Sequence, residues 1–254
     1  MVNIKSKSEI EIMKRSGAIL IEVLNILEKN IRPGITTLQL DEIAEKTIRS
    51  HNAIPSFKGY KMSGSIDFPG SICSSINDEV VHGIPGNRVL IEGDIASIDV
   101  GVYFEGFHTD AARTWGVGTI SPEAQHLIDV AKQSFFEGLK MARQNNRIID
   151  ISGAIEDYVL HNGYTLVTEL TGHGIGRSLH EDPSIPNFRS NQKGPRLRSG
   201  MALAIEPMIN MGKSKVRTND NGWTIFTKDG QLSAHYENTI IVTEFEPLIL
   251  TLEG

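Results

Sequence analysis

The stretch that most constrains the fold runs from residue 95 to residue 115 and reads IASIDVGVYFEGFHTDAARTW. Apolar and polar residues alternate up to Phe104 and again from Phe107, which is the period of two of a half-buried strand. Glu105-Gly106 interrupts the alternation and is typical of a two-residue turn. The sequence therefore predicts a β-hairpin in which Phe104 lies opposite Phe107.

Two aspartates of this hairpin fall on one face. Counting back from the turn places Gly101 opposite Asp110. It also places Asp99 opposite Ala112, so the two aspartates are diagonal neighbours with Cα atoms about 7–8 Å apart. Adjacent carboxylates do not both stay ionised without a proton or a cation between them. A single aspartate would be expected to cap a turn or to lie in solvent, but a pair on one face of an apolar hairpin favours a metal site.

The composition excludes several other functions. The chain has 254 residues, enough for a large core, and its formal charge of −6 comes without the basic block that nucleic acid or an anionic membrane would require. The single cysteine, Cys73, excludes an internal disulfide and favours a reducing compartment. The chain shows no signal peptide and no apolar run of membrane-spanning length. We therefore expect a cytoplasmic protein that binds neither nucleic acid nor membrane.

The two halves of the chain repeat one order of elements. The first is expected to begin with a helix over residues 8–29, in which Ser8 and Glu11 form a capping box, followed by a shorter helix. The second is expected to begin with a helix over residues 121–144 and a shorter one that ends near His161. Strand segments follow each pair of helices.

This repetition favours a pseudo-symmetric α+β domain over a dinucleotide-binding fold. The halves span about residues 8–120 and 121–250 of a single domain that covers residues 1–254. Amphipathic helices share apolar spacing without common ancestry, so the repetition is weak evidence by itself. The segment TGHGIG at 171–176 lacks the glycine order of a dinucleotide-binding loop and does not lie between a strand and a helix. We therefore do not interpret it as a phosphate loop.

Three more residues with metal-binding side chains lie in apolar or glycine-rich surroundings. His173 lies in ELTGHGIGRSLHE, Glu206 ends the apolar run GMALAIE, and Glu237 lies in SAHYENTIIVT. A buried glutamate without a partner is rare because desolvation of its charge is costly. Each of the three by itself could belong to a buried ion pair. Together with the two aspartates, they favour a shared cation site.

At this point the sequence resembles the type I methionine aminopeptidases of the short bacterial kind. The motifs that carry the resemblance follow the family's order over nearly the whole chain and read SICSSINDEVVHGIP, GDIASIDVGVYFEGFHTDAARTW, TGHGIGRSLHEDPSIPNF, GMALAIEPMI and DNGWTIFTKDGQLSAHYENTIIVT. The resemblance implies the pita-bread fold, in which two related halves form a curved antiparallel sheet with helices on its outer face. It also implies hydrolytic removal of the N-terminal methionine from nascent proteins and peptides whose second residue is small.

The resemblance further implies a dinuclear metal site built from five side chains, Asp99, Asp110, His173, Glu206 and Glu237. In that family the residue at Asp99 binds one metal, and those at His173 and Glu206 bind the other. Asp110 and Glu237 would bridge the two metals. One imidazole among four carboxylates is a mostly oxygen site that suits Mn, Fe(II) or Co without ranking them. Tetrahedral zinc sites rich in cysteine are excluded, because the chain has one cysteine.

The resemblance also implies roles for several histidines. His82, in VVHGIP, resembles the residue that hydrogen-bonds near the scissile amide, and His180, in SLHEDP, resembles the one that steadies the oxyanion. The implied mechanism is peptide-bond hydrolysis by metal-activated water, with Glu206 carrying the proton. The substrate's free amine would bind a metal, which restricts cleavage to the first residue. His108 and His235 each lie two residues from a ligand, so each orients that ligand or lies exposed on a strand.

The resemblance also indicates a pocket for the methionine side chain, made by Phe68, Cys73, Leu179 and Trp223. A soft apolar slot with a thiol and aromatic edges suits a thioether. The alternative is that these are ordinary core residues, and for Cys73 alone that is the better interpretation. The loop before the pocket departs from the family's pattern, with Ser65, Ile66 and Phe68 where aromatic, histidine and tyrosine residues are usual. Leu179 also stands where phenylalanine is common. These departures concern substrate range, and no metal ligand is lost.

Two other functions stay open. An Xaa-Pro peptidase shares the fold but carries an additional N-terminal domain, which is not expected here. A catalytically silent relative that binds polypeptides or the ribosome usually loses ligands, and all five are present. A dinuclear phosphoesterase would need more histidines and a basic rim. We expect a monomer that meets the N-termini of nascent chains transiently at the ribosome.

Overall fold

The computed structural model describes residues 2–61 and 66–252. The predicted hairpin is confirmed with its register, since β4 (Ile95–Phe104) pairs antiparallel with β5 (Phe107–Gly116) and Gly101 lies opposite Asp110. The turn residues Glu105 and Gly106 have φ angles of 47° and 92°. Two successive positive φ angles define a type I′ turn, whose twist matches that of the paired strands.

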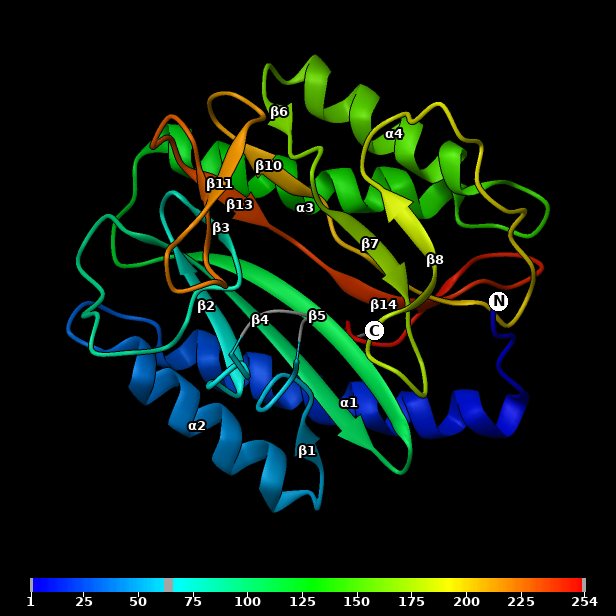
Figure 1. Cartoon of the computed structure of the whole chain (residues 1–254), viewed down its shortest axis with the longest axis horizontal. Coiled ribbons are helices and arrows are strands. Elements are labelled where there is room, and N and C mark those ends of the chain that lie inside the picture. Colours follow the sequence, from blue (N-terminus) through cyan, green and yellow to red (C-terminus); the bar gives the residue numbers. More distant parts are fainter. Residues whose placement is uncertain (1, 62–65, 253–254) are drawn as a thin grey trace.

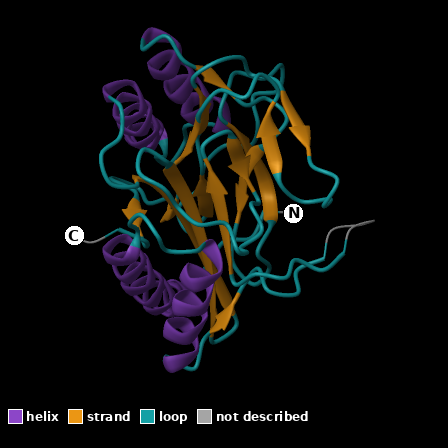
Figure 2. Ribbon diagram, turned by 90° about the vertical axis from the view of Figure 1, so that its left-hand side faces the viewer, coloured by secondary structure: helices purple, strands orange, loops and turns teal. Residues whose placement is uncertain are grey.

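Four long helices cover one side of the strands: α1 (Lys7–Asn30), α2 (Thr37–Ser50), α3 (Pro122–Met141) and α4 (Ile148–His161). They form two pairs, α1 with α2 and α3 with α4, and α1 also packs on β4 and β5. In Figure 1 the first pair lies below the hairpin and the second above it. Figure 2 shows both pairs on the same side of the strands. None of the helices within the described ranges combines the length and the apolar character needed to cross a membrane.

The predicted start of the first helix was wrong by a residue or two. Its N-cap is Ser6, whose hydroxyl accepts a hydrogen bond from the amide of Glu9, while the Glu9 carboxylate accepts one from the amide of Ser6. The pair Ser8 and Glu11 has the same spacing of three residues, so the sequence pattern did not separate the two registers. The third helix begins after Ser121 as predicted, although it ends at Met141, before residue 144.

The shorter strands complete an α+β architecture in which every strand pairing of the described residues is antiparallel. β1 (Ile54–Pro55) and β2 (Ile72–Ile76) pair with successive parts of β4. The other strands are β3 (Glu79–Val81), β6 (Thr165–Leu166), β7 (Thr171–Gly174), β8 (Glu181–Pro186), β9 (Ala202–Ile205), β10 (Met208–Asn210), β11 (Val216–Thr218), β12 (Ile225–Thr227), β13 (Ser233–His235), β14 (Asn238–Ile241) and β15 (Leu248–Ile249). They form sheets with the orders β15-β14-β9-β7-β8, β13-β10-β6 and β11-β12-β3.

Two segments of the second half cross from one sheet to another. We expected single strands over residues 201–209 and 232–242, but each is interrupted, at Glu206-Pro207 and at Tyr236-Glu237. β9 and β14 pair in the five-stranded sheet, whereas β10 and β13 pair in a three-stranded sheet, so the two interruptions face each other. The amide of Glu237 also donates to the carbonyl of Ala112 on the hairpin, at 3.0 Å. Both glutamates therefore lie where the two sheets and the hairpin meet.

Each pair of helices covers its own hydrophobic core. Leu20, Leu27 and Ile98 belong to the core of the first half, and Phe135 and Leu203 to that of the second. We propose that the two cores are related halves of one domain, about residues 8–120 and 121–250, because hydrogen bonds between the hairpin and the interruption at Tyr236-Glu237 join them.

Gly17 in α1 permits a close contact between the first helix and the end of the chain. A Cβ atom at Gly17 would lie 2.1 Å from the carbonyl oxygen of Leu250. Alanine raises helix propensity by about 1 kcal/mol over glycine, but overpacking costs about 1–3 kcal/mol or more where backbone must move. We therefore expect Gly17→Ala to lower the free energy of unfolding by about 1–2 kcal/mol in urea titrations.

The matched control is Gly153→Ala in α4. A Cβ atom there meets the end of the flexible Arg189 side chain, at 3.1 Å. This variant should be as stable as the wild type or more stable, because the side chain can shift while helix propensity improves. A Gly17→Ala variant that matched the Gly153→Ala variant in stability would contradict the packing argument.

Candidate active site

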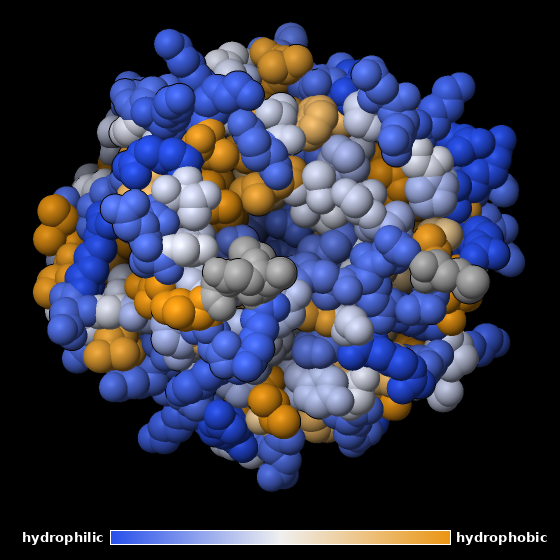
Figure 3. Space-filling view, viewed as in Figure 1, coloured by the Kyte–Doolittle hydropathy of each residue, from blue (hydrophilic) through white to orange (hydrophobic). Residues whose placement is uncertain are grey.

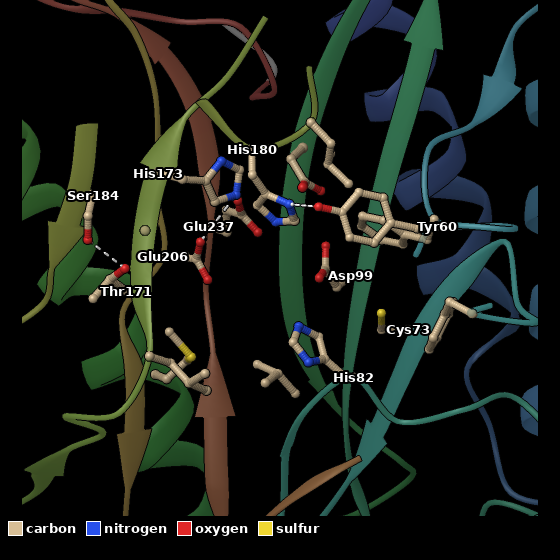
Figure 4. A pocket seen from close by; sticks show the side chains of 18 of the residues that line it. Tyr60, Cys73, His82, Asp99, Thr171, His173, His180, Ser184, Glu206 and Glu237 are labelled. Atoms are coloured by element: carbon tan, nitrogen blue, oxygen red, sulfur yellow. Dashed lines mark hydrogen bonds and ion pairs between the residues drawn. The ribbon is translucent and has the colours of Figure 1, made fainter. Parts of the chain in front are cut away.

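A cavity of about 430 Å³ lies between the hairpin and the sheets of the second half. The structure places all of the predicted site residues on its wall: Phe68, Cys73, His82, Asp99, Asp110, His173, Leu179, His180, Glu206, Trp223 and Glu237. Figure 3 shows the molecule hollowed near the middle of the viewed face. Figure 4 shows Asp99 and His82 on one side of the cavity and His173 and Glu206 on the other.

The two hairpin aspartates lie next to each other in the cavity, Asp110 buried and Asp99 partly buried. Asp110 is 3% exposed, and neither its Oδ1 atom nor that of Asp99 has a hydrogen-bond partner. Burial raises the pKa of Asp99 to about 7. Burial, together with the charges of Asp99 and Glu206, raises the pKa of Asp110 well above its usual value. Like charges in a low-dielectric site repel strongly, so this pair requires protons or a bound cation.

Glu206 and Glu237 face the same space from the opposite side. Glu237 is 2% exposed and its Oε1 atom has no hydrogen-bond partner. Burial raises the pKa of both glutamates well above the usual value, and the neighbouring acids add to the effect. Within residues 2–61 and 66–252, no lysine or arginine forms an ion pair with any of the four carboxylates. No basic side chain in the described part of the chain therefore supplies the positive charge that these acids need.

His173 offers a nitrogen lone pair to these acids. Its Nδ1 lies 2.9 Å from the carbonyl oxygen of Gly174, and because a carbonyl only accepts, the hydrogen must be on Nδ1. Nε2 therefore carries the lone pair, and it lies 3.5 Å from Oε1 of Glu206. Burial lowers the pKa of His173 to about 3, so the ring is neutral near pH 7. A neutral imidazole whose tautomer is fixed by a backbone carbonyl is the usual form of a histidine metal ligand.

His235 is buried beneath the two glutamates. It is 2% exposed, and its Nε2 lies 3.8 Å from Oε2 of Glu206 and 3.8 Å from Oε2 of Glu237. The alternative that this residue lies exposed on a strand was wrong, because the strand crosses between two sheets here and has no solvent-facing side. Two groups of three ligand atoms, each within 4.8 Å of one another, share Glu237: one adds Asp110 and His173, the other Glu206 and His235.

These observations fit divalent metal ions. The site combines four carboxylates, two of them buried and two partly buried, with unpartnered oxygen atoms and a neutral imidazole. It has no basic counter-ion among the described residues. Hard divalent cations prefer oxygen ligands and accept imidazole, and they would neutralise the repulsion that burial intensifies.

The other two predicted histidines lie at opposite ends of the acidic cluster. His82 has a φ angle of 58°, an uncommon backbone conformation for a non-glycine residue, and its buried Nδ1 has no hydrogen-bond partner. Burial lowers its pKa to about 4. The ring of His180 packs edge-on against that of His173, with centroids 4.3 Å apart. Its Nδ1 lies 2.6 Å from the hydroxyl of Tyr60, a residue that the sequence analysis did not select.

The predicted methionine pocket forms one apolar wall of the cavity. Phe68, Cys73, Leu179 and Trp223 belong to one buried cluster. The rings of Phe68 and Trp223 meet edge-on with centroids 5.2 Å apart, and the indole nitrogen of Trp223 donates to the carbonyl of Ile66 at 2.9 Å. Ser65, the other departure noted in this loop, lies outside the described residues. The slot therefore has aromatic walls and a thiol.

The chain matches Metallopeptidase family M24 over residues 11–244 and therefore belongs to that family. It is 53% identical to the methionine aminopeptidase of Clostridium perfringens and 47% identical to methionine aminopeptidase 1 of Bacillus subtilis, and each alignment covers 99% of both chains. The solved methionine aminopeptidase of Thermotoga maritima superposes with a TM-score of 0.95 at 39% identity over all of both chains. The predicted resemblance and the pita-bread α+β fold are confirmed.

A more distant neighbour shares only the fold. The Xaa-Pro dipeptidase of Bacillus anthracis superposes with a TM-score of 0.78 at 23% identity, and the match covers 99% of this chain and 62% of that one. Membership of the M24 metallopeptidases implies divalent metal ions, which agrees with the cluster of acids in the cavity.

The buried carboxylates predict how the metal-free protein responds to pH. Their folded-state pKa values are raised, so their contribution to stability is complete below about pH 4 and is lost as the pH rises through the folded values, about 7 for Asp99. Three histidines have lowered pKa values in the folded state, so they reduce the stability of the folded protein as the pH falls below about 6.5. They are His82, His173 and His235. Comparison with the double variant Asp99→Asn/Glu206→Gln isolates the effect of the carboxylates, because the variant keeps all three histidines.

We expect the Tm of the metal-free wild type to fall relative to that of this variant as the pH rises from about 4 to 8. Added Mn²⁺ should raise the Tm of the wild type most at the upper end of this range, because bound metal competes with protons for the same oxygen atoms. Differential scanning calorimetry with and without Mn²⁺ measures both effects. If the Tm values of the wild type and the variant changed in parallel with pH, ionisation of Asp99 and Glu206 would not destabilise the folded protein.

Proposed function

We propose that this chain is a metal-dependent aminopeptidase that removes the N-terminal methionine from nascent proteins and peptides with a small second residue. The observation that carries the proposal is that one cavity joins a cluster of four acids and a histidine to an apolar, thiol-containing slot. Full-length relatives named methionine aminopeptidase support the same activity. The 23% identity to an Xaa-Pro dipeptidase supports no more than a common fold.

We propose that two divalent metal ions are held by Asp99, Asp110, His173, Glu206 and Glu237, with Mn, Fe(II) and Co as the candidates. When bound, such ions polarise the scissile carbonyl group and lower the pKa of water, and they offer a position for the substrate's amine. The nearly all-oxygen donor set and the fixed Nε2 lone pair of His173 support this assignment.

The side chains around the metal centre would move the proton and support the carbonyl oxygen. Glu206, whose pKa is raised by burial, takes a proton from the attacking water and delivers it to the amide nitrogen as the C–N bond breaks. His180 donates a hydrogen bond to the carbonyl oxygen as negative charge develops on it, and His82 hydrogen-bonds near the scissile amide. Each histidine acts as a neutral donor, since burial lowers the pKa of both rings.

The cavity itself would select the substrate. The metal centre would bind the neutral amine of a free N-terminus, while Phe68, Cys73, Leu179 and Trp223 enclose the methionine side chain. Because these residues are buried, the slot ends against the core and admits one side chain. We further propose a cytoplasmic monomer that meets nascent chains transiently at the ribosome. A buried free thiol at Cys73 is compatible with a reducing compartment.

The direct test is release of methionine from Met-Ala-Ser by metal-stripped protein with Mn, Fe(II), Co or Zn added back. We expect metal-dependent release, and a loss of about 10³-fold or more in Asp99→Asn, because that change removes a charged ligand from the centre. Asp129→Asn, which alters an exposed aspartate of α3, is the control and should retain full activity. Absence of release with every metal, from folded protein, would refute the proposed function, and preferential cleavage of Xaa-Pro peptides would redirect it.

A further inference from the structure

Tyr60 and His180 form a hydrogen-bonded pair on the wall of the cavity. The Tyr60 hydroxyl lies 2.6 Å from Nδ1 of His180, and the two rings meet edge-on with centroids 5.2 Å apart. Both side chains line the cavity, and Figure 4 shows the bond between them above Asp99. Because Nδ1 is engaged by Tyr60, Nε2 is the nitrogen that remains to meet a substrate.

The backbone around Tyr60 fixes the position of its ring. The amide of Gly59 donates to the carbonyl of Phe68 at 2.8 Å, and the amide of Phe68 donates to the carbonyl of Tyr60 at 2.9 Å. The amide of Tyr60 also donates to the carbonyl of Phe57, at 2.8 Å. On the other side, Phe68 packs against Trp223, which anchors this short ladder to the methionine pocket. The hydroxyl of Tyr60 is therefore placed before any substrate binds.

His180 is confined between two partners. Tyr60 holds Nδ1, and the ring of His173 packs against it at an interplanar angle of 70°. Rotation of the His180 ring would break the hydrogen bond or collide with His173. The hydrogen bond with Tyr60 thus sets the direction in which Nε2 points.

We propose that Tyr60 is a positioning residue that acts through His180, an inference that rests on the function proposed above. The Tyr60 O–H donates to Nδ1, which is possible only if Nδ1 lacks hydrogen and Nε2 carries it. Nε2–H is then a preset donor for the carbonyl oxygen of the scissile bond, the requirement for stabilising an oxyanion. Burial raises the pKa of Tyr60, which keeps its donor hydrogen in place.

The chain contains a matched control for this pair. The hydroxyl of Tyr164 lies 2.8 Å from Nδ1 of His126, with ring centroids 5.5 Å apart, and neither residue lines the cavity. Tyr60→Phe and Tyr164→Phe therefore remove the same kind of hydrogen bond, one at the cavity and one on the helical surface.

We expect Tyr60→Phe to lower kcat on Met-Ala-Ser by about 10-fold with little change in KM, because a residue that orients a donor acts mainly in the transition state. Tyr164→Phe should leave both parameters unchanged. His180→Ala should lower kcat further, and the double variant Tyr60→Phe/His180→Ala should be no worse than His180→Ala alone, since Tyr60 acts through that ring. Independent losses that add in the double variant would overturn the proposal.

The tautomer of His180 gives a readout that needs no activity. Nitrogen-15 NMR of metal-free protein with labelled histidine should show hydrogen on Nε2 of His180 in the wild type and a mixture of tautomers in Tyr60→Phe. Hydrogen on Nδ1 in the wild type, or an unchanged tautomer in the variant, would overturn the assignment. A wild type that releases no methionine would refute the proposed function, while the NMR result would still decide whether Tyr60 sets the tautomer.

Discussion

Mutual repulsion among four clustered carboxylates, two buried and two partly buried, is the constraint on which the rest of this structure depends. Asp99 and Asp110 come from β4 and β5, and Glu206 and Glu237 from the interruptions between strands of the second half. The fold holds all four around one cavity. Such an arrangement is costly without protons or cations, because a low dielectric strengthens like-charge repulsion. A metal-free protein must therefore hold extra protons here, whereas a loaded one exchanges them for metal ions. The fold therefore accommodates this site only in combination with protons or cations.

Contacts made away from the carboxylates hold the surrounding backbone in place despite this repulsion. The guanidinium of Arg113 donates to the carbonyl oxygens of Ala112, Glu237 and Thr251 and to the side chain of Asn238, and it stacks on the ring of Tyr236 at 4.5 Å. It thereby joins the hairpin to the interruption between β13 and β14. Burial lowers its pKa, but carbonyl oxygens on several sides satisfy its donors. A buried cation thus anchors the backbone of Glu237 without neutralising its carboxylate, which stays available as a ligand.

The hairpin and its aspartates could be predicted from the sequence because a period of two and a two-residue turn fix every cross-strand pair. Glu206 and Glu237 could be selected because acids are rare in apolar runs. The proximity of these two glutamates could not be predicted, since it depends on two segments that cross between sheets at interruptions that face each other. His235 was ambiguous for the same reason: a strand of alternating pattern offers an outward face, but a crossing strand does not. Tyr60 gave no signal, because its role arises from one hydrogen bond across 120 residues.

The two histidines that pack against each other in the cavity show how one side chain can serve two chemistries. In His173 the partner of Nδ1 is a backbone carbonyl, which accepts, so Nδ1 keeps the hydrogen and Nε2 presents a lone pair suited to a metal ion. In His180 the partner is a hydroxyl, which can donate, so Nδ1 accepts and Nε2 would present hydrogen suited to an oxyanion. Desolvation lowers the pKa of both rings, which favours their neutral forms. The difference between ligand and donor then depends on the atom behind each ring, and a carbonyl could not replace the hydroxyl of Tyr60.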